Sequence, residues 1–153
     1  MPKIDITKAP VRTGTNYPEQ FRQIVRGREK CAIGDLAGLT QFGVNVTTLK
    51  PGSASSARHW HEQEDELVYV LEGELVLVED GGEVALKAGE AAGFKAGVPN
   101  GHHLINKSDR DARYLEIGTR AVRERSHYSD VDLAVTRDES GKAIFTNKSG
   151  QPY

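Results

Sequence analysis

The stretch His59-Trp60-His61-Glu62-Gln63-Glu64-Asp65-Glu66 decides the fold of this chain and carries its chemistry. Successive side chains of a β-strand alternate between two faces, so His59 and His61 project from the same face. Glu66 follows five residues after His61. Two imidazoles, this carboxylate and a third imidazole from a distant strand would form a pocket for a divalent metal ion.

A second pair of histidines, His102 and His103, can supply that third imidazole. The chain has five histidines, and four of them fall into these two clusters. Imidazole suits zinc, copper, iron and nickel, and a carboxylate shifts the preference toward iron(II), manganese or zinc. We therefore expect one divalent metal per chain, either Fe, Mn, Ni or Zn.

Glycines bracket both clusters at fixed spacing. Gly52 precedes the first cluster and Gly73 follows it, and the second cluster lies in the run Gly89, Lys95-x-Gly97, His102 and Asn106. Over residues 40 to 118 this arrangement resembles the two motifs of the cupin superfamily. The resemblance implies an all-β fold, the double-stranded β-helix or cupin jelly-roll barrel, and the metal ligands His59, His61, Glu66 and His102.

The second motif departs from the family pattern, which leaves alternatives for the ligands. Lys95 stands where the motif has proline, and His102 fits only with a loop two residues longer than usual. His102 keeps the motif spacing to Asn106 and shares its strand parity, whereas His103 has the opposite parity and is the alternate ligand. Asp65 is a rival for Glu66, and the step from Glu66 to the motif glycine favours Glu66.

The whole chain bounds the class of protein. It has 153 residues, a formal net charge of −2 and one cysteine, which excludes a disulfide within the chain. This length suits one domain, and the charge gives no reason to expect nucleic acid or an anionic membrane as partner. No apolar run is long enough to span a membrane, and the N-terminus lacks an apolar signal core, so we expect a cytoplasmic protein.

Within one domain we distinguish three regions. Residues 1–39 form an N-terminal arm and a first strand region, and residues 40–120 form the cupin barrel core with both metal motifs. Short alternating runs separated by glycine turns predict the strands of this core. Residues 121–153 form a C-terminal β-hairpin, with strands near 132–136 and 143–146, that packs on the barrel.

One strand of the core predicts an assembly. If Glu66 points into the barrel, Leu67, Tyr69 and Leu71 face outward. Such a run of large apolar side chains has to be covered by the tail hairpin or by a second subunit. We expect a homodimer.

Two classes of function fit these observations. The resemblance implies a family that includes oxygenases, isomerases, decarboxylases and binding proteins. We predict a metal-dependent protein that acts on a small polar or anionic molecule, isomerase-like or dioxygenase-like, with Lys95, Arg58 or Arg28 contacting the anion. The alternative is a non-catalytic sensor or storage module. An enzyme needs a general acid or base beside the metal, and the sequence alone identifies no catalytic residue, although it slightly favours an enzyme.

Overall fold

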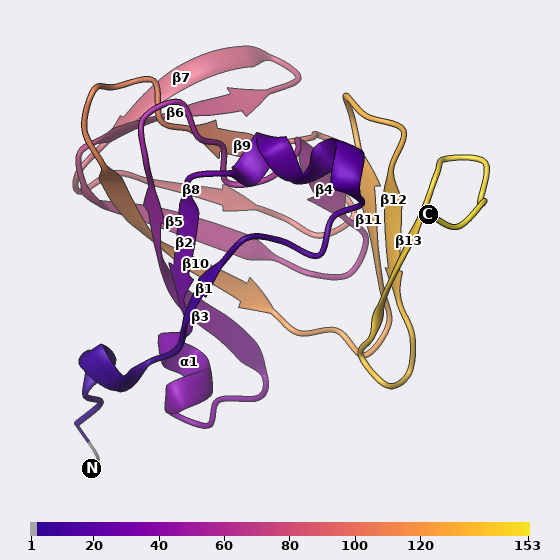
Figure 1. The fold of residues 1–153 in the computed structure, drawn as a ribbon, viewed down its shortest axis with the longest axis horizontal. Coiled ribbons are helices and arrows are strands. Elements are labelled where there is room, and N and C mark those ends of the chain that lie inside the picture. Colours follow the sequence, from indigo (N-terminus) through magenta and orange to yellow (C-terminus); the bar gives the residue numbers. More distant parts are fainter. Residues whose placement is uncertain (1–2) are drawn as a thin grey trace.

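Thirteen β-strands dominate residues 3–153, the part of the chain that the computed structural model describes (Figure 1). They form antiparallel sheets of six, four and three strands, so the predicted all-β jelly roll is confirmed. The strands are β1 (Val11–Thr13), β2 (Arg28–Cys31), β3 (Phe42–Leu49), β4 (His59–His61), β5 (Glu66–Glu72), β6 (Glu74–Glu79), β7 (Gly82–Lys87), β8 (Ala91–Phe94), β9 (His103–Ile105), β10 (Ala112–Thr119), β11 (Glu124–Tyr128), β12 (Ala134–Arg137) and β13 (Ala143–Thr146). The helical segments are η1 (Ile6–Lys8), η2 (Glu19–Val25) and α1 (Ile33–Leu36).

The six-stranded sheet has the order β1-β2-β3-β10-β5-β8. Its centre is β10, which pairs with β3 on one side and β5 on the other. On β10 the alternation of side chains sends Tyr114 and Glu116 inward and Leu115 and Ile117 outward. Tyr114 is fully buried, as this alternation requires.

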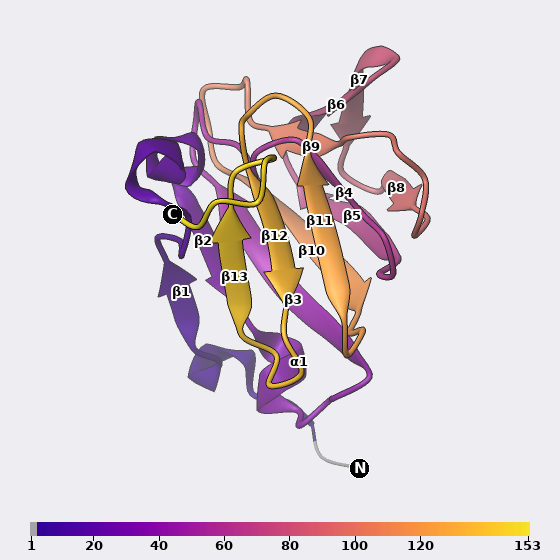
Figure 2. The same ribbon diagram turned by 90° about the vertical axis from the view of Figure 1, so that its right-hand side faces the viewer.

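The four-stranded sheet, in the order β13-β12-β11-β4, forms the second layer of the barrel. Figure 2 shows β13, β12 and β11 side by side in front of β3 and β10. The sequence predicted the β12–β13 hairpin, and it predicted that the tail only packs on the barrel. The structure instead pairs β11 with β4, so the tail continues the sheet that carries His59 and His61. The tail is therefore part of the barrel wall.

The three-stranded sheet, in the order β7-β6-β9, closes one end of the barrel. The β6–β7 hairpin turns at residues 79–82. Gly73 joins β5 to β6 with φ of 79°, and a Cβ atom there would lie 3.0 Å from the Cβ of Ala112. Glycine is needed at this position because the conformation is left-handed and the approach is close.

A buried amide ties this end of the barrel together. Asn106 is fully buried, and its Nδ2 donates to the carbonyls of Leu49 at 2.7 Å and Arg110 at 2.8 Å. Its Oδ1 accepts from the backbone N–H and hydroxyl of Ser108. Since a buried polar group has to be hydrogen-bonded, these contacts account for asparagine at the end of the second motif.

Two apolar clusters make the core. The larger lies between the six- and three-stranded sheets, and the smaller joins the N-terminal segment to the tail. The larger contains Leu49, Val68, Val70, Leu75, Leu77, Leu86, Leu104, Ala112 and Tyr114, and the smaller contains Tyr17, Val25, Ala57, Tyr128 and Leu133.

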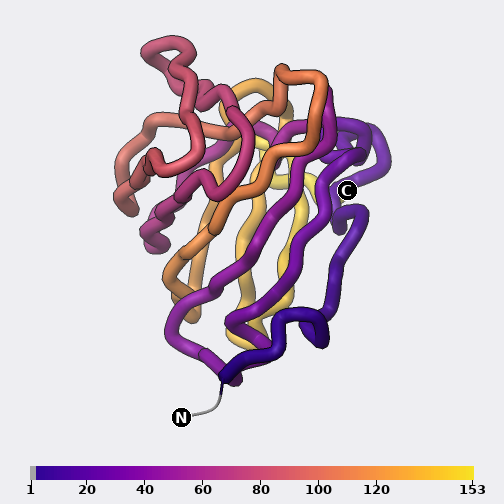
Figure 3. The backbone as a smooth tube through the Cα atoms, turned by 90° about the vertical axis from the view of Figure 1, so that its left-hand side faces the viewer, coloured from indigo at the N-terminus to yellow at the C-terminus, as the bar shows by residue number. Residues whose placement is uncertain are grey.

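Residues 3–39 lie along the barrel rather than away from it. β1 and β2 extend the six-stranded sheet beyond β3, which β2 joins with Arg28 opposite Leu49. Figure 3 shows this N-terminal segment running up one side of the barrel to the C-terminus, where Phe21 and Tyr153 meet edge to face. The first two residues of the predicted arm are outside the described residues.

The outer face of β5 is exposed as predicted. Leu67, Tyr69 and Leu71 are 40–42% exposed. The tail hairpin lies in the other layer and does not cover them. Among residues 3–153, none of the helices has both the length and the apolar character that crossing a membrane requires.

Candidate metal centre

Three side chains converge inside the barrel to make the candidate centre. His59 and His61 come from β4, and their Nε2 atoms are 3.0 Å apart. Glu66, the first residue of β5, has its Oε2 3.9 Å from Nε2 of His61. One donor atom from each of the three lies within 4.8 Å of the others. Two imidazoles and a carboxylate at this spacing fit a divalent transition metal.

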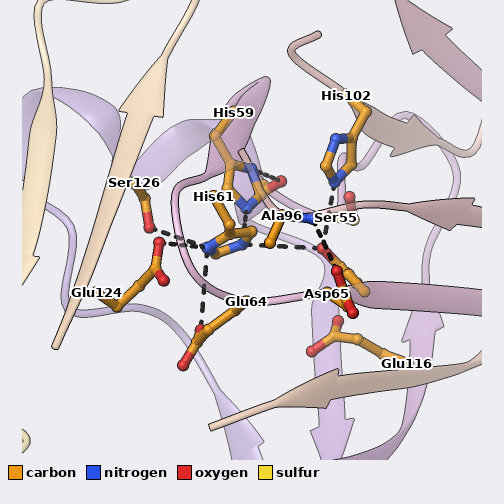
Figure 4. Close-up of polar contacts among 12 residues, drawn as sticks. Ser55, His59, His61, Glu64, Asp65, Ala96, His102, Glu116, Glu124 and Ser126 are labelled. Atoms are coloured by element: carbon orange, nitrogen blue, oxygen red, sulfur yellow. Dashed lines mark hydrogen bonds and ion pairs between the residues drawn. The ribbon is translucent and has the colours of Figure 1, made fainter. Parts of the chain in front are cut away.

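His102 adjoins this group from the opposite side. Its Nε2 is 3.2 Å from Oε2 of Glu66, and its ring stacks on Phe94 with centroids 3.5 Å apart. Its backbone pairs with His59 in an isolated antiparallel bridge, which aligns the two side chains. Figure 4 shows the rings of His59, His61 and His102 turned toward the same space.

His103 points elsewhere. Its Nδ1 is 2.9 Å from the carbonyl oxygen of Ser56, at the back of the β4 strand. The preceding Gly101 lets this segment approach the tail, because a Cβ there would lie 2.0 Å from Oγ of Ser129. The structure thus places His102 beside Glu66 and turns His103 away.

A hydrogen bond to the other ring nitrogen of His59 determines which nitrogen can bind a metal. Nδ1 of His59 is 3.0 Å from the carbonyl oxygen of Ala57, and a carbonyl only accepts, so this nitrogen carries the proton and Nε2 presents its lone pair. Burial lowers the pKa of His59 well below its ordinary value, and the neighbouring His61 and His102 lower it further. The ring therefore stays neutral, as a metal ligand must.

His61 is held by residues of the tail. Its Nδ1 is 3.2 Å from Oγ of Ser126 and 3.4 Å from Oε1 of Glu124 (Figure 4). Both partners lie on β11, which pairs with β4. The buried Glu124 also accepts the backbone N–H groups of residues 62 and 63, so its carboxylate is fixed in place. A carboxylate behind a histidine orients the ring and raises its basicity as a ligand.

A cavity of about 280 Å³ opens beside His59 and His61. Its wall is charged rather than apolar. It is lined by Tyr17, Arg28, Lys30, Ser55, Ser56, His59, His61, Glu64, Asp65, Glu66, Glu116, Gly118, Thr119 and Arg137.

Two ion pairs stand in that wall. Nζ of Lys30 is 2.7 Å and 2.9 Å from the two carboxylate oxygens of Glu116. Burial alone would raise the pKa of Glu116, but the charge and hydrogen bonds of Lys30 lower it below its ordinary value, so Glu116 is ionised at neutral pH. Nη1 of Arg137 is 2.6 Å from Oε1 of Glu64.

Two of the three residues that the sequence proposed for an anion lie outside this cavity. Arg58 has the strand parity opposite to His59, and its guanidinium binds Asp130, with Nε 2.9 Å from Oδ2, and Asp80. Lys95 lines a second cavity of about 210 Å³ that reaches His61 and His102 from the β8 side. Arg28, the third candidate, does line the main cavity.

Sequence reasoning missed Lys30, Glu116, Glu124 and Arg137. The run Arg28-Glu29-Lys30-Cys31 carries a signal, because alternation on a strand puts both cations on one face. The alternation on residues 113–118 likewise groups Tyr114 with Glu116. Glu124 and Arg137 have no such local signal, since their place depends on the order of strands in the second sheet.

Comparisons with known proteins identify the family of this chain. The sequence profile of the cupin domain family matches residues 45–118. A crystal structure named as a sugar phosphate isomerase from a cupin superfamily, from Silicibacter pomeroyi, is 45% identical, with a TM-score of 0.95 over 99% of this chain and 96% of that one. A search of curated proteins finds no match.

More distant structures share the fold. A protein of Acidithiobacillus ferrooxidans, assigned by inference as a sugar phosphate isomerase, is 25% identical, with a TM-score of 0.74 over 82% of this chain and 80% of that one. The polyketide cyclase RemF of Streptomyces resistomycificus is 20% identical, with a TM-score of 0.63 over 78% and 79% of the two chains, and shows the fold alone. By its fold, its two motifs and its 45% identical relative, the chain belongs to the cupin superfamily.

Proposed function

We propose that this protein is a metal-dependent isomerase of a small anionic hydroxy-carbonyl compound, of the sugar phosphate class. One observation carries the proposal: the cavity beside the histidine cluster is lined by titratable groups, among them the Lys30–Glu116 pair. A protein that only stores or senses a ligand would need few such groups there. The name of the 45% identical relative supports the sugar phosphate class.

The residues of this chain suit the reaction. Interconversion of an aldose and a ketose moves one proton between neighbouring carbons and another between their oxygens, so it needs a base and an electrophile near one carbonyl. A divalent ion held by His59, His61, Glu66 and His102 would supply the Lewis acidity that polarises the carbonyl oxygen.

Glu116 and Lys30 divide the proton transfers. The ionised carboxylate of Glu116 accepts the proton from the carbon beside the carbonyl and returns it to the neighbouring carbon. Nζ of Lys30 holds Glu116 in place and has a further N–H to donate to a substrate oxygen. Neither residue binds the metal, so loss of either should leave metal binding intact.

The test is isomerisation of aldose and ketose phosphates by metal-loaded protein in D₂O, followed by proton NMR. A proton taken by Glu116 exchanges with solvent, so turnover should place deuterium at the carbon beside the carbonyl. We expect Glu116→Gln to reduce kcat by about 10²–10⁴-fold, the usual contribution of a general base. Glu29→Gln, one residue from Lys30 but on the outer face of β2, is the matched control and should keep full activity.

Two results would count against isomerisation, and a third would count against the role of Glu116. Oxygen consumption with an organic substrate would indicate a dioxygenase. Tight binding of a sugar phosphate with no turnover and no deuterium exchange would indicate a binding module. Full activity of Glu116→Gln would remove Glu116 from the mechanism.

A further inference from the structure

We infer that Arg28 is an anion-binding site in the wall of the metal cavity and receives the phosphate or carboxylate group of the ligand. The inference deepens the proposed function and rests on it for the reaction that the bound molecule undergoes. The charges and hydrogen bonds of the cavity support the site itself.

The guanidinium of Arg28 is anchored by neutral groups. Its Nη1 donates to the carbonyl oxygen of Ser55 at 2.5 Å, and its Nη2 donates to the carbonyl oxygen of Gly14 at 3.3 Å. A guanidinium has five N–H donors in a rigid plane, so three remain for a ligand. The two backbone contacts hold the plane still, which reduces the entropy that ligand binding would cost.

Arg28 differs from the other cations of the cavity in having no carboxylate partner. Lys30 is paired with Glu116 and Arg137 with Glu64, with exposed side-chain fractions of 10–35%. Within residues 3–153, no acidic group forms an ion pair with Arg28. The charge of Arg28 reaches Glu116 and helps to lower the pKa of that carboxyl, but the carboxylate is hydrogen-bonded to Lys30. A positive charge in a recessed wall with no direct ion pair is a place for an anion from solution.

The overall charge of the cavity points to the same class of ligand. Its lining holds three cationic side chains and four carboxylates, those of residues 64, 65, 66 and 116. The net charge of this lining is therefore −1, and a divalent metal bound beside Glu66 would change it to +1. An anionic ligand would restore neutrality, with Arg28 as the lining cation that is free to pair.

Hydroxyl groups beside Arg28 can complete the site. Tyr17 is 8% exposed and lines the same cavity. Oγ of Ser55 accepts the backbone N–H of Leu104 at 2.9 Å, so its own O–H is available to a ligand. A guanidinium fork with neighbouring hydroxyls matches the tetrahedral oxygens of phosphate or the two oxygens of a carboxylate.

The test measures binding and not turnover. Metal-loaded wild-type protein is titrated calorimetrically with inorganic phosphate, with acetate, and with glycerol as a neutral control. We expect phosphate or acetate to bind and glycerol not to bind. Arg28→Met should lower the affinity for the anion by about tenfold or more, the effect of losing a charge-assisted hydrogen bond. The anion that responds identifies the ligand group as phosphate or carboxylate. Arg12→Met, which removes an exposed arginine on β1, is the matched control and should bind like wild type.

Equal affinity of wild type and Arg28→Met for both anions would overturn the inference. So would an equal loss in Arg12→Met, which would show a non-specific effect of charge. If Arg28→Met fails to fold, ¹⁵N-arginine spectra of the wild type replace it, with the Arg28 side-chain signal assigned by its loss in Arg28→Lys. An Arg28 signal that does not move at saturating phosphate and acetate also overturns the site.

The two proposals fail separately. A protein that isomerises no sugar phosphate but binds phosphate through Arg28 would refute the proposed function and keep this site. An active isomerase whose Arg28→Met variant retains wild-type anion affinity would do the reverse.

Discussion

His102 and His103 are neighbours in the sequence, but only His102 is placed as a candidate metal ligand. Nε2 of His102 lies 3.2 Å from Glu66, whereas the His103 ring binds the carbonyl of Ser56. On a strand, a shift of one residue exchanges the two faces. The pair therefore provides its own control, with the same side chain at neighbouring positions.

We expect His102→Ala to lower the affinity for a divalent metal by more than the 10–100-fold that loss of an outer partner typically costs. His103→Ala should keep the affinity within a few-fold of wild type. Elemental analysis of protein purified without added metal, followed by competition with a chelator, measures both. A larger loss in His103→Ala would mean that the strand register assigned to β9 is incorrect.

Glu124 is an outer partner of the centre. Its Oε1 lies 3.4 Å from Nδ1 of His61, and it also caps two backbone N–H groups. We expect Glu124→Gln to weaken metal binding by about 10–100-fold because the neutral amide no longer supports His61 as a ligand. Glu62→Gln, which removes a carboxylate that pairs with His127 instead, is the control. Unchanged metal affinity in Glu124→Gln would show that Ser126 alone orients His61.

At the scale of elements, the sequence predicted where strands lie along the chain far better than it predicted which strands pair in a sheet. The residue pattern located β4, β5 and the β12–β13 hairpin, because alternation and turn residues are local signals. The pairing of β11 with β4 is set by contacts between residues some 65 positions apart. No local pattern encodes such a pairing, and so Glu124 and Arg137 were absent from the predicted site.

The same distinction applies within the site. His59, His61 and Glu66 were predicted together because two consecutive strands carry them. Lys30 lies on β2 and meets Glu116 on β10 only because β3 lies between these strands. Their ion pair is a feature of the sheet order, and it links the N-terminal region to the centre of the barrel.

This link between β2 and β10 makes stability depend on pH. Lys30 keeps the pKa of Glu116 below its ordinary value of 4.5 in the folded protein. The stabilisation is fully present above the unfolded-state pKa and is lost as the pH falls through the lower folded-state pKa. We therefore expect wild type to lose its stability advantage over Glu116→Gln as the pH falls through and below 4.5, the ordinary pKa of the carboxyl.

Urea denaturation of metal-free protein at several pH values measures this difference in the free energy of unfolding. Lys30→Met tests the sign, because it leaves a partly buried carboxylate without its main partner. That variant should be destabilised more at pH 7 than at pH 4, since protonation removes the unpaired charge. A difference between wild type and Glu116→Gln that stays constant over this range would contradict the pairing.

At the scale of the whole molecule, the barrel has a charged cavity beside the histidines and an apolar outer face. Asn45 on β3 donates to Glu116 inside, so Val44 and Val46 of the same strand face outward. The neighbouring strands continue this outer face. It includes Phe42, Leu67, Tyr69 and Leu71, which are 39–42% exposed, and the partly exposed Val44, Val46, Leu115 and Ile117. A contiguous apolar surface over three adjacent strands is typical of an interface between proteins.

A second copy of the chain is the partner we expect on this face, joined around a two-fold axis so that each copy covers the same residues of the other. Light scattering at micromolar concentration should give twice the chain mass of 16.7 kDa. Tyr69→Asp places a charge at the centre of the face and should yield monomers, because a buried unpaired charge is costly. Val122→Asp, at a residue 74% exposed on the β10–β11 connection, should leave the mass unchanged. Metal content should stay at the wild-type level in both variants, since the centre lies inside the barrel and Tyr69 points away from it. A wild-type mass of one chain would leave the outer face to a different partner, because the tail hairpin belongs to the opposite layer and cannot reach it.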